Sequence, residues 1–468
     1  MTGTTSTERP TAARLTLIMG CLTVFMANLD TTILNVALPA MARDLAAPTS
    51  GLQWTVNAYV LTRAGSLFVC ASLGDRFGHR RVWTAGLALF AVSSLGCGLV
   101  PGLGGLVALR VAQSLGGAMM TPATLAMVTR AYPAGPARAQ ALGIWSSSTG
   151  IAMALGPVIG GVLVDAVGWR SVFFVNVPIA VVALCCGRLM ADGRRAATVP
   201  RLDLVGQGFL VVTLFALTYA LITAPERGWA SPVTLGLLVL AAATAAGFVV
   251  VERRSDHPLL DLDDFRRPEL VGAVTLAIAA FLCLGGFLFF NTLWLQDVRG
   301  FSALHAGLLT APATLTSFLL APVAGRLVGR IGPRVPATLG GGCLAVATLL
   351  LALTVTAHGP VWPVLFGYVL LGAGLGLTNT PVNTIAVSSM PPERSGVAGA
   401  IATTSRQIGN NLGVALLGTV VFSAATFVPG LTTAYVVAAA ATAAAAGFVA
   451  WALRARPAPA QPRATSRM

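Results

Sequence analysis

The chain has 468 residues, of which 56% are hydrophobic and only 10% charged, and its net charge is +14. Soluble domains usually carry about 25% charged residues, so this composition excludes an ordinary soluble globular protein. The sequence contains no lysine, and every basic side chain other than histidine is arginine. The phosphate-binding loop of P-loop ATPases requires a lysine, which excludes an ATP-driven pump of that kind. The arginines are scattered between apolar stretches, which argues against a nucleic-acid partner and indicates a membrane protein.

Fourteen apolar stretches are long enough to cross a bilayer as helices, which takes about 20 residues each. They leave room only for short loops and tails, so we expect an all-α polytopic membrane protein with fourteen transmembrane helices. The seven cysteines fall inside these stretches without metal or haem spacing, and we expect them to be unpaired packing residues. The stretches are centred near Val24, Leu61, Ala91, Gly117, Ala152, Ile179, Thr213, Val239, Phe281, Ala313, Leu344, Leu371, Gly413 and Ala440.

The placement of the arginines predicts how the chain is oriented. Three arginines lie within the stretches, four lie in one set of alternate loops, and all others lie in the opposite loops and the tails. The positive-inside rule puts the arginine-rich side in the cytoplasm, and an even number of spans then puts both termini there. The alanine- and arginine-rich composition suggests a bacterial source, so we expect the inner (cytoplasmic) membrane, with anionic lipids near the cytoplasmic arginines.

An internal repeat divides the chain. The loop sequence of residues 73–80 recurs at residues 327–334, and the loop that follows Tyr132 has a counterpart at residues 390–394. Repeats of six-span halves are typical of transporters, with the substrate site between the halves. The stretches near Thr213 and Val239 have no counterpart, and we interpret them as an insert. The predicted parts are a cytoplasmic tail (1–14), an N-terminal six-helix bundle (15–190), two inserted helices (200–252), a connector (253–268), a C-terminal six-helix bundle (269–453) and a cytoplasmic tail (454–468).

Four charged residues lie inside the stretches: Asp30, Arg63, Arg110 and Arg406. A charge at the centre of a span costs about 2.5–3.5 kcal/mol on insertion scales, so it normally faces a partner or a wet cavity. From the helix rise, Asp30 and Arg63 lie about 14 Å below the outer surface, with Arg110 slightly shallower, and the three can face one another. Burial disfavours a charged carboxylate and a nearby arginine favours it, so Asp30 can take up and release a proton. The alternative is a static ion pair that locks the helices.

Arg63 has two candidate roles. It either neutralises Asp30 or meets an anionic group on the substrate. The alternative is an arginine that snorkels to the surface, although its depth makes this difficult.

Polar and aromatic residues within the stretches are candidates for a substrate cavity, because ligand sites are mostly apolar with a few placed polar groups. For each of them the alternative is a hydrogen bond between helices. These candidates are Asn35, Trp54, Asn57, Trp145, Asn291, Asn379, Asn383 and Gln407.

The loop after the second stretch predicts a cytoplasmic gate formed by Asp75, Arg76, Gly78 and Arg80. We expect Asp75 at a helix start, where the helix dipole stabilises a carboxylate. A contact made in only one conformation would bias the transport cycle toward that conformation. The alternative is a solvated loop that only carries the positive charge of the cytoplasmic side.

The fifth stretch contains Gly156, Pro157 and Gly160. Proline lacks a backbone donor and clashes with the preceding turn, so Pro157 should kink the helix as part of the gate. Glycines four residues apart permit close helix approach, and packing alone is the alternative role. The acidic segment from Asp256 to Asp264 has no metal-ligand spacing, and we expect no metal site.

Six motifs, in order along the chain, resemble the fourteen-span drug/proton antiporter branch of the major facilitator superfamily. The resemblance covers nearly the whole chain and implies a major facilitator fold of two six-helix bundles with two inserted central helices. It further implies that Arg110 is a proton-coupling or structural arginine and that the 73–81 loop tunes the balance between inward- and outward-facing states. At Arg63 the family is usually apolar, so no role transfers. The motifs are residues 29–39 with Asp30, the loop 73–81, Arg110 with Gln113, Gly156-Pro157 with Gly160 and Gly161, Gly168-Trp169-Arg170 leading to Asn176 and Pro178, and Arg406-Gln407 with Gly409.

We therefore predict a secondary active exporter that works by alternating access. It would expel hydrophobic or amphipathic drugs or antibiotics in exchange for protons, as a monomer and without any other cofactor. A dedicated exporter of a single metabolite, for example an acidic one, in self-resistance is the alternative, and a membrane sensor or scaffold without transport is a third reading. We expect no enzyme, because the stretches contain no nucleophile–base set.

Overall fold

A computed structural model describes residues 8–133, 135–190, 203–255, 261–390 and 395–455, which form helices and short connections with no strand among them. Each of the fourteen predicted stretch centres lies in a helix. The ends of both predicted tails, residues 391–394 of the second repeat loop and residues 256–260 of the acidic segment lie outside the described residues.

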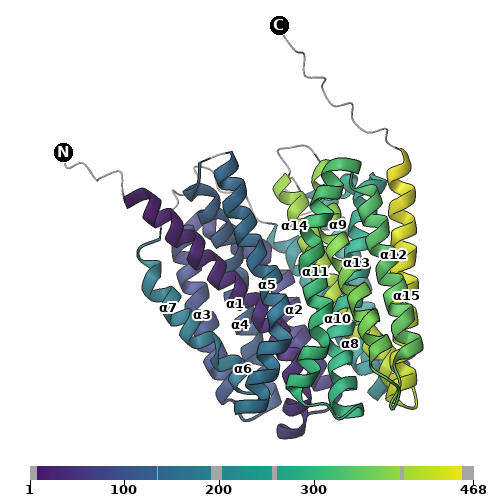
Figure 1. The fold of residues 1–468 in the computed structure, drawn as a ribbon. Helices are drawn as coiled ribbons and strands as arrows, with labels where there is room; N and C mark the ends of the chain where they lie inside the picture. Colours follow the sequence, from purple (N-terminus) through teal and green to yellow (C-terminus); the bar gives the residue numbers. More distant parts are fainter. Residues whose placement is uncertain (1–7, 134, 191–202, 256–260, 391–394, 456–468) are drawn as a thin grey trace, which may run out of the picture.

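The first half of the chain forms one group of helices (Figure 1). They are α1 (Glu8–Asp44), α2 (Thr49–Phe77), α3 (His79–Leu99), α4 (Leu103–Ala131), α5 (Pro136–Val167), α6 (Ser171–Phe174) and α7 (Asn176–Gly187). The second half forms a group beside it. It comprises α10 (Pro268–Leu293) with a π-helical turn (Trp294–Val298), α11 (Ala303–Ile331), α12 (Arg334–Thr354), α13 (Trp362–Ser388), α14 (Ser395–Ser423) and α15 (Phe427–Ala452).

The pairing of helices follows the repeat seen in the sequence. In the first half α1 packs on α5, α3 on α4, α2 on α4 and α3 on α7; in the second half α10 packs on α14, α12 on α13, α11 on α13 and α12 on α15. Between the halves, α5 packs on α11 and α2 on α14, which is again a matched pair. The contact pattern therefore agrees with the two-half repeat predicted from the sequence.

The repeated loops adopt the same turn. Gly78 between α2 and α3 has a φ of 96°, and Gly332 between α11 and α12 has a φ of 79°. Only glycine adopts these angles without strain, so the glycine shared by the two loops ends one helix and aims the next.

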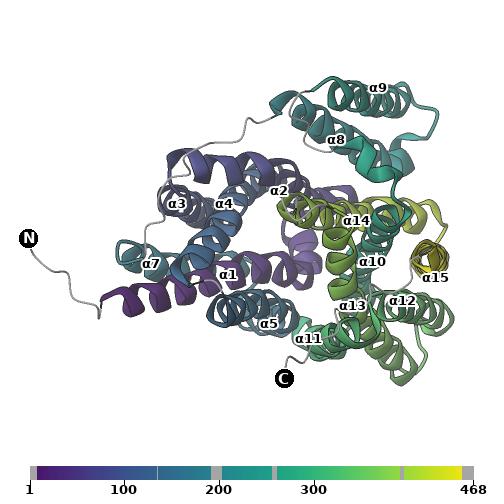
Figure 2. The ribbon, with the colours of Figure 1, turned by 90° about the horizontal axis from the view of Figure 1, so that it is seen from above.

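The insert consists of α8 (Leu204–Arg227) and α9 (Pro232–Arg254), which pair with each other outside the two halves (Figure 2). Helix α8 contacts α2 of the first half and α14 of the second. Asn411 Nδ2 donates to Thr218 Oγ1 at 2.6 Å, and Thr419 Oγ1 donates to the Leu221 carbonyl oxygen at 2.7 Å. The insert thus covers the α2–α14 junction and touches both halves.

The length and apolarity of the described helices support a multi-pass membrane protein. They do not confirm the number of transmembrane helices that the sequence predicted. Of the described helices, eleven are long and apolar enough to cross a membrane, and α2 makes twelve if its two parts, which meet at 50°, count as one span. Helix α14 does not reach this criterion, and the pair α6–α7 is a shorter apolar segment. The count of fourteen therefore stays a prediction. Helix α5 continues through Pro157, and the one sharp bend found among the described spans lies in α2.

Small residues set the helix spacing inside each half. A Cβ at Gly116 on α4 would lie 2.6 Å from the Gly86 carbonyl oxygen and 2.7 Å from the Phe90 amide nitrogen on α3. Neither atom can move without moving the backbone of α3, so α3 and α4 are in contact because residue 116 has no side chain.

We expect the substitution Gly116→Val to force α3 and α4 apart and to destabilise the first half by about 1–3 kcal/mol, the usual cost of overpacking. The measurement is the midpoint of thermal unfolding of the purified protein in detergent. The matched control is Gly342→Val on α12, where a Cβ meets no atom within 4 Å of the described neighbours. Equal midpoints for the two variants would contradict this account of α3–α4 packing.

Candidate functional site

A buried carboxylate and a buried guanidinium form an ion pair in the first half. Asp30 on α1 and Arg110 on α4 are each 1% exposed, and Asp30 Oδ2 lies 2.5 Å from Arg110 Nη1. Each charge alone would be costly among apolar helices, so the partner explains why both are tolerated. The sequence predicted that these two residues can face one another, and the structure brings them together.

Three uncharged side chains complete the hydrogen bonds of this pair. Gln113 Nε2 and Asn176 Nδ2 donate to Asp30 Oδ1 at 2.8 and 2.9 Å. Arg110 Nη1 also donates to Gln113 Oε1 at 2.7 Å. Both amides donate to Ser94 Oγ, at 3.0 and 3.1 Å. The carboxylate of α1 is therefore linked to α3, α4 and α7.

Arg110 is also held by α2, independently of Asp30. Its guanidinium carbon lies 4.2 Å from the centroid of the Tyr59 ring, a cation–π contact. Its Nε donates to the Thr55 carbonyl oxygen at 3.3 Å. These contacts remain available to the guanidinium when the carboxylate is neutral.

Sequence reasoning missed part of this network. Gln113 and Asn176 stand in motifs that the sequence displays, but neither was predicted as a site residue. The spacing of Arg110 and Gln113 places both on one helix face, and this was the available signal for Gln113. No sequence signal marks Ser94.

Arg63 does not contact Asp30. It is 8% exposed, and its Nη2 donates to Thr121 Oγ1 of α4 at 3.3 Å. Asp30 pairs with Arg110 instead, so this structure gives no support to the hypothesis that Arg63 neutralises Asp30. The hypothesis that Arg63 meets an anionic group on the substrate stays a prediction.

Arg406 lies on α14 beside other residues predicted for the substrate cavity. Its Nη1 donates to Asn383 Oδ1 of α13 at 2.9 Å, and its Nη2 donates to Thr403 Oγ1 at 3.0 Å. Gln407 and Asn379 are half-buried on the same two helices. Among the described residues, no carboxylate lies within ion-pair distance of Arg406 or Arg63.

Two other predicted cavity residues make contacts between helices. The Trp54 ring packs against Phe215 and Tyr219 of the inserted helix α8, with centroid distances of 5.3 and 5.4 Å. Asn291 on α10 is buried and accepts a hydrogen bond from the Tyr368 hydroxyl on α13. Asn291 thus makes the hydrogen bond between helices that was the alternative given above, whereas Trp54 makes an aromatic contact that the sequence analysis did not consider.

The remaining predicted cavity residues differ in whether their polar side-chain atoms have hydrogen-bond partners. Trp145 Nε1 donates to Thr124 Oγ1 of α4 at 3.3 Å, and Asn35 Nδ2 donates to the Thr31 carbonyl oxygen of its own helix at 3.1 Å. Asn57 on α2 is fully buried, and neither atom of its amide has a hydrogen-bond partner among the described residues.

The predicted gate loop is arranged differently from the expectation. Asp75 lies in the last turn of α2 and not at a helix start, so the prediction of its position was wrong. At this end the helix dipole opposes a negative charge. His79 Nε2 lies 3.3 Å and Arg130 Nη2 of α4 lies 3.8 Å from Asp75 Oδ1. All three residues belong to the first half.

The other two charged residues of the gate loop point elsewhere. The Arg76 guanidinium lies over the Phe77 ring, and Arg80 Nη1 donates to the Met190 carbonyl oxygen at 3.5 Å. The cluster of Asp75 with Arg76 and Arg80 that the sequence suggested is therefore not formed in this conformation.

Polar contacts between the halves lie at the end of the bundle opposite the two chain ends (Figure 1). The Asp165 carboxylate at the end of α5 accepts hydrogen bonds from the backbone N–H groups of Ala303 and Leu304, at 3.1 and 2.9 Å. It thereby caps the start of α11 in the other half, where the positive end of the helix dipole favours a carboxylate.

Three more polar contacts join the halves at the same end. Gln296 Nε2 donates to the Val36 carbonyl oxygen and Gln53 Nε2 to the Val414 carbonyl oxygen, both at 2.9 Å. An exposed ion pair joins Arg43 and Asp297 at 3.4 Å. Several hydrogen bonds join described residues of the two halves. The one nearest the chain ends is donated by Thr314 Oγ1 to the Ala154 carbonyl oxygen.

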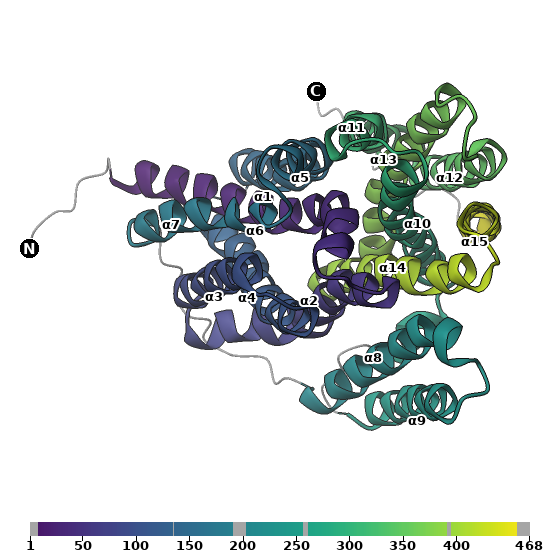
Figure 3. The same cartoon turned by 90° about the horizontal axis from the view of Figure 1, so that it is seen from below.

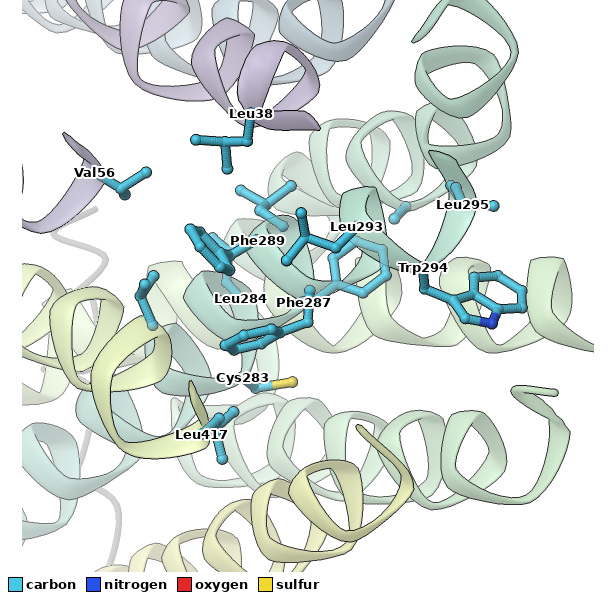
Figure 4. Packing of buried hydrophobic residues seen from close by; sticks show 14 of the residues in the cluster. Leu38, Val56, Cys283, Leu284, Phe287, Phe289, Leu293, Trp294, Leu295 and Leu417 are labelled. Carbon is cyan, nitrogen blue, oxygen red and sulfur yellow. The ribbon is translucent and has the colours of Figure 1, made fainter. Parts of the chain in front are cut away.

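Apolar packing closes the same end. Figure 4 shows Leu38 of α1 and Val56 of α2 lying toward Phe289 and Leu284 of α10. All four are almost fully buried and belong to one cluster that spans both halves. Apolar packing and the polar contacts therefore join the two halves at the same end of the bundle.

The glycines of the fifth stretch serve this closure. A Cβ at Gly160 would lie 2.9 Å from Ile33 Cγ1 of α1, and one at Gly156 would collide with Thr32, so the close helix approach expected of these glycines is made with α1. Gly161 of the same helix faces Leu304, whose Cα would lie 2.6 Å from an added Cβ. One helix thus packs on its own half with two glycines and on the other half with a third.

No metal site is found in the part of the chain that the structure describes, since no three potential ligands from His, Cys, Asp or Glu come together there.

Comparison with known proteins gives consistent matches. Residues 20–414 match the family model described as Major Facilitator Superfamily. The chain is 39% identical to the multidrug resistance protein Stp of Mycobacterium tuberculosis, over 87% of this chain and 75% of that protein. It is also 39% identical to the tetracenomycin C resistance and export protein of Streptomyces glaucescens, over 87% and 76%. Among solved structures, a POT family transporter in complex with 5-aminolevulinic acid has the same fold, with a TM-score of 0.71, 16% identity and coverage of 92% of this chain and 95% of that one.

We expect Asp165→Asn to weaken the contact between the halves at this end, because the amide lacks the charge that the start of α11 favours. Loss of an exposed charge at a helix start costs about 0.3–1 kcal/mol, which shifts the ratio of joined to separated halves about 2- to 5-fold. The measurement is the distance distribution between spin labels on the outer ends of the two halves, in a background without the native cysteines. The control is Asp297→Asn, because an exposed ion pair contributes about 1 kcal/mol at most. An unchanged distribution in Asp165→Asn would show that this cap does not hold the halves together.

Proposed function

Because this chain belongs to the major facilitator superfamily, a family of transporters and not of enzymes, we propose that it is a secondary active efflux transporter for hydrophobic or amphipathic drugs or antibiotics. The names of its relatives, a multidrug resistance protein and an antibiotic resistance and export protein, support the direction of transport and the class of substrate. The observation in the structure that carries the proposal is the ion pair of Asp30 and Arg110, a buried titratable carboxylate inside the half that must move against the other.

The coupling ion is the proton, and Asp30 carries it. When the carboxylate is charged, Arg110, Gln113 and Asn176 hold it and link α1 to α4 and α7. A proton on Asp30 removes the charge that Arg110 neutralises and so weakens the link between α1 and α4. Arg110 keeps its contacts with Tyr59 and with the Thr55 carbonyl oxygen. The proton therefore changes how α1 sits in the first half, and no other cofactor is needed.

Alternating access follows from where the halves touch. The hydrogen bonds that join the described parts of the two halves begin with Asp165 at the outer end. The one nearest the cytoplasmic end is that of Thr314. This arrangement suits a state that is closed outside and open to the cytoplasm. Release of the substrate outside requires that the bonds of Asp165, Gln296 and Gln53 break while the cytoplasmic ends come together.

The membrane topology completes the proposal. We assign fourteen spans, as in the drug/proton antiporter branch, by adding the polar helix α14 and the short pair α6–α7 to the helices that meet the apolar criterion. Both chain ends lie on one side of the bundle, and the distribution of arginines puts that side in the cytoplasm. The membrane is the bacterial inner membrane, anionic lipids face the cytoplasmic arginines, and the transporter acts as a monomer on small molecules.

We expect cells of an efflux-deficient bacterium that express this protein to accumulate less of at least one hydrophobic drug than cells with the empty vector. A protonophore should abolish the difference, because the proton gradient drives efflux. The variant Asp30→Asn should also abolish it, yet should still exchange labelled for unlabelled drug in proteoliposomes, because exchange needs no change in protonation. The matched control is Asp263→Asn, an exposed residue in a surface ion pair, which should behave as wild type.

Each outcome bears on a different part of the proposal. Efflux that survives complete collapse of the gradient would exclude proton antiport, and full activity of Asp30→Asn would remove this residue from the coupling. Unchanged accumulation of every drug in the panel would exclude multidrug efflux. Because removal of one partner from a buried pair costs about 3–5 kcal/mol, the exchange assay also verifies that the variant is folded.

A second candidate, the export of a dedicated acidic metabolite, is favoured by one observation. Arg63 of α2 and Arg406 of α14 lack a carboxylate partner among the described residues. The two helices run in opposite directions and are in register through the Gln53–Val414 contact. Arg63 then lies about 15 Å and Arg406 about 12 Å from that contact, at nearly the same depth in the two halves.

We expect Arg63→Gln with Arg406→Gln to raise the KM for acidic substrates about 10- to 100-fold, which corresponds to the loss of one hydrogen bond to a charged group. Uncharged substrates should be transported as before. Uptake into inverted vesicles measures both. An equal loss for both kinds of substrate would assign these arginines to the structure of the helices and not to recognition of an acidic group.

A further inference from the structure

A cavity of about 570 Å³ lies between α3 and α7, at the end of the bundle where both chain ends emerge. Three of its lining residues are arginines: Arg80 and Arg81 from the first turn of α3, and Arg188, which follows α7. The opposite part of the lining is apolar and comes from Ala85, Ala88 and Leu184. The cavity therefore has a strongly basic end and an apolar wall.

The close approach of α7 to α3 gives this cavity its shape. A Cβ at Gly187 would lie 2.6 Å from Cζ3 of the buried Trp83 ring, so only a glycine allows the end of α7 to lie against α3. Arg80 Nη1 reaches across to the Met190 carbonyl oxygen. The small side chains of Ala85 and Ala88 on α3 leave the space that the cavity occupies.

The charge of the cavity is not balanced by the described part of the protein. No acidic residue is among its lining residues, and no ion pair between described residues involves Arg80, Arg81 or Arg188. Asp75, which precedes Arg80 by five residues, lies close to His79 and Arg130, and Asp192, four residues after Arg188, lies outside the described residues. Three guanidinium groups at one end of a cavity form a site with the planar, multiple donors that phosphate oxygens prefer.

The surroundings of the cavity face lipid. Val181 and Val182 of α7 and Val92 of α3 are 50%, 54% and 69% exposed, as is expected of side chains that contact acyl chains. Figures 2 and 3 place α3 and α7 at the rim of the bundle that is farthest from the second half. The apolar wall is therefore continuous with the hydrocarbon-facing surface, and its basic end lies at the membrane boundary.

We propose that this cavity binds one anionic phospholipid, whose phosphate group contacts the three arginines and whose acyl chain lies along Ala85, Ala88 and Leu184. A free phosphate ion would use the arginines but not the apolar wall, so the lining favours a lipid. The proposal rests on the membrane topology given above but not on proton coupling, and its test measures binding, not transport. It also gives Arg80 a function outside the gate that the sequence suggested.

The test uses the purified full-length protein, stripped of lipid in detergent, with native mass spectrometry to count the bound lipids. Palmitoyl-oleoyl phosphatidylglycerol is the anionic probe, and phosphatidylcholine with the same chains is the zwitterionic one. We expect one phosphatidylglycerol to bind in preference to phosphatidylcholine. An arginine near an anionic lipid surface contributes about fivefold, so Arg81→Gln with Arg188→Gln should weaken this binding about 30-fold.

Matched variants make the result specific. Arg253→Gln with Arg254→Gln removes the same charge from α9, outside the cavity, and should bind phosphatidylglycerol as wild type does. Arg81→Lys with Arg188→Lys should recover only part of the binding, because an ammonium group keeps the charge but not the planar set of donors, and Leu184→Asp should remove it without loss of an arginine. Equal loss in the α9 variant would show that net charge alone attracts the lipid and would overturn the proposal. Equal affinity for phosphatidylcholine, or for the soluble headgroup glycerol phosphate, would overturn it as well.

Discussion

The ion pair between Asp30 and Arg110 is the constraint on which the first half depends. Two charges that are 1% exposed among apolar helices require each other, and the remaining lone pairs of the carboxylate require donors. Gln113 and Asn176 supply those donors and meet again at Ser94. One carboxylate thereby fixes the mutual arrangement of four helices. The same dependence makes the arrangement sensitive to a single proton, and this is the physical basis of the coupling that we propose.

The contact between the halves depends on close packing and a few polar bonds, and not on a buried ion pair. In a membrane the apolar surface of a helix gains little by leaving lipid, so association depends on close packing and on a few polar bonds. Gly161 allows the backbone of α5 to approach α11, and the Asp165 carboxylate then caps the start of α11. Such contacts form or break together, because they all lie at one end. The inserted helix α8 touches α2 and α14 across the same junction, so the insert must follow or limit the movement of these two helices.

The arginines that give the chain its charge of +14 fall into groups with different roles. Arg110 neutralises a buried carboxylate, whereas Arg63 and Arg406 have only uncharged partners among the described residues. Arg80, Arg81 and Arg188 surround a cavity that opens toward lipid. Because all of these residues are arginines, it is their position in the bundle that decides which role we propose for each of them.

The sequence by itself determined the helical architecture and the two-half repeat, and it singled out Asp30 and Arg110 as candidate site residues. These features follow from local properties: apolar length, the recurrence of the loop that contains Gly78 and Gly332, and the cost of a charge within a span. Only the tertiary structure decided the partners. It showed that Ser94 and Asn176 complete the site, that Trp54 packs on the insert, that Asp75 ends a helix, and that Asp165 caps a helix of the other half. The physical reason is that a hydrogen bond or an ion pair is fixed by distance and direction in space, and residues that are 138 positions apart carry no local sign of their contact.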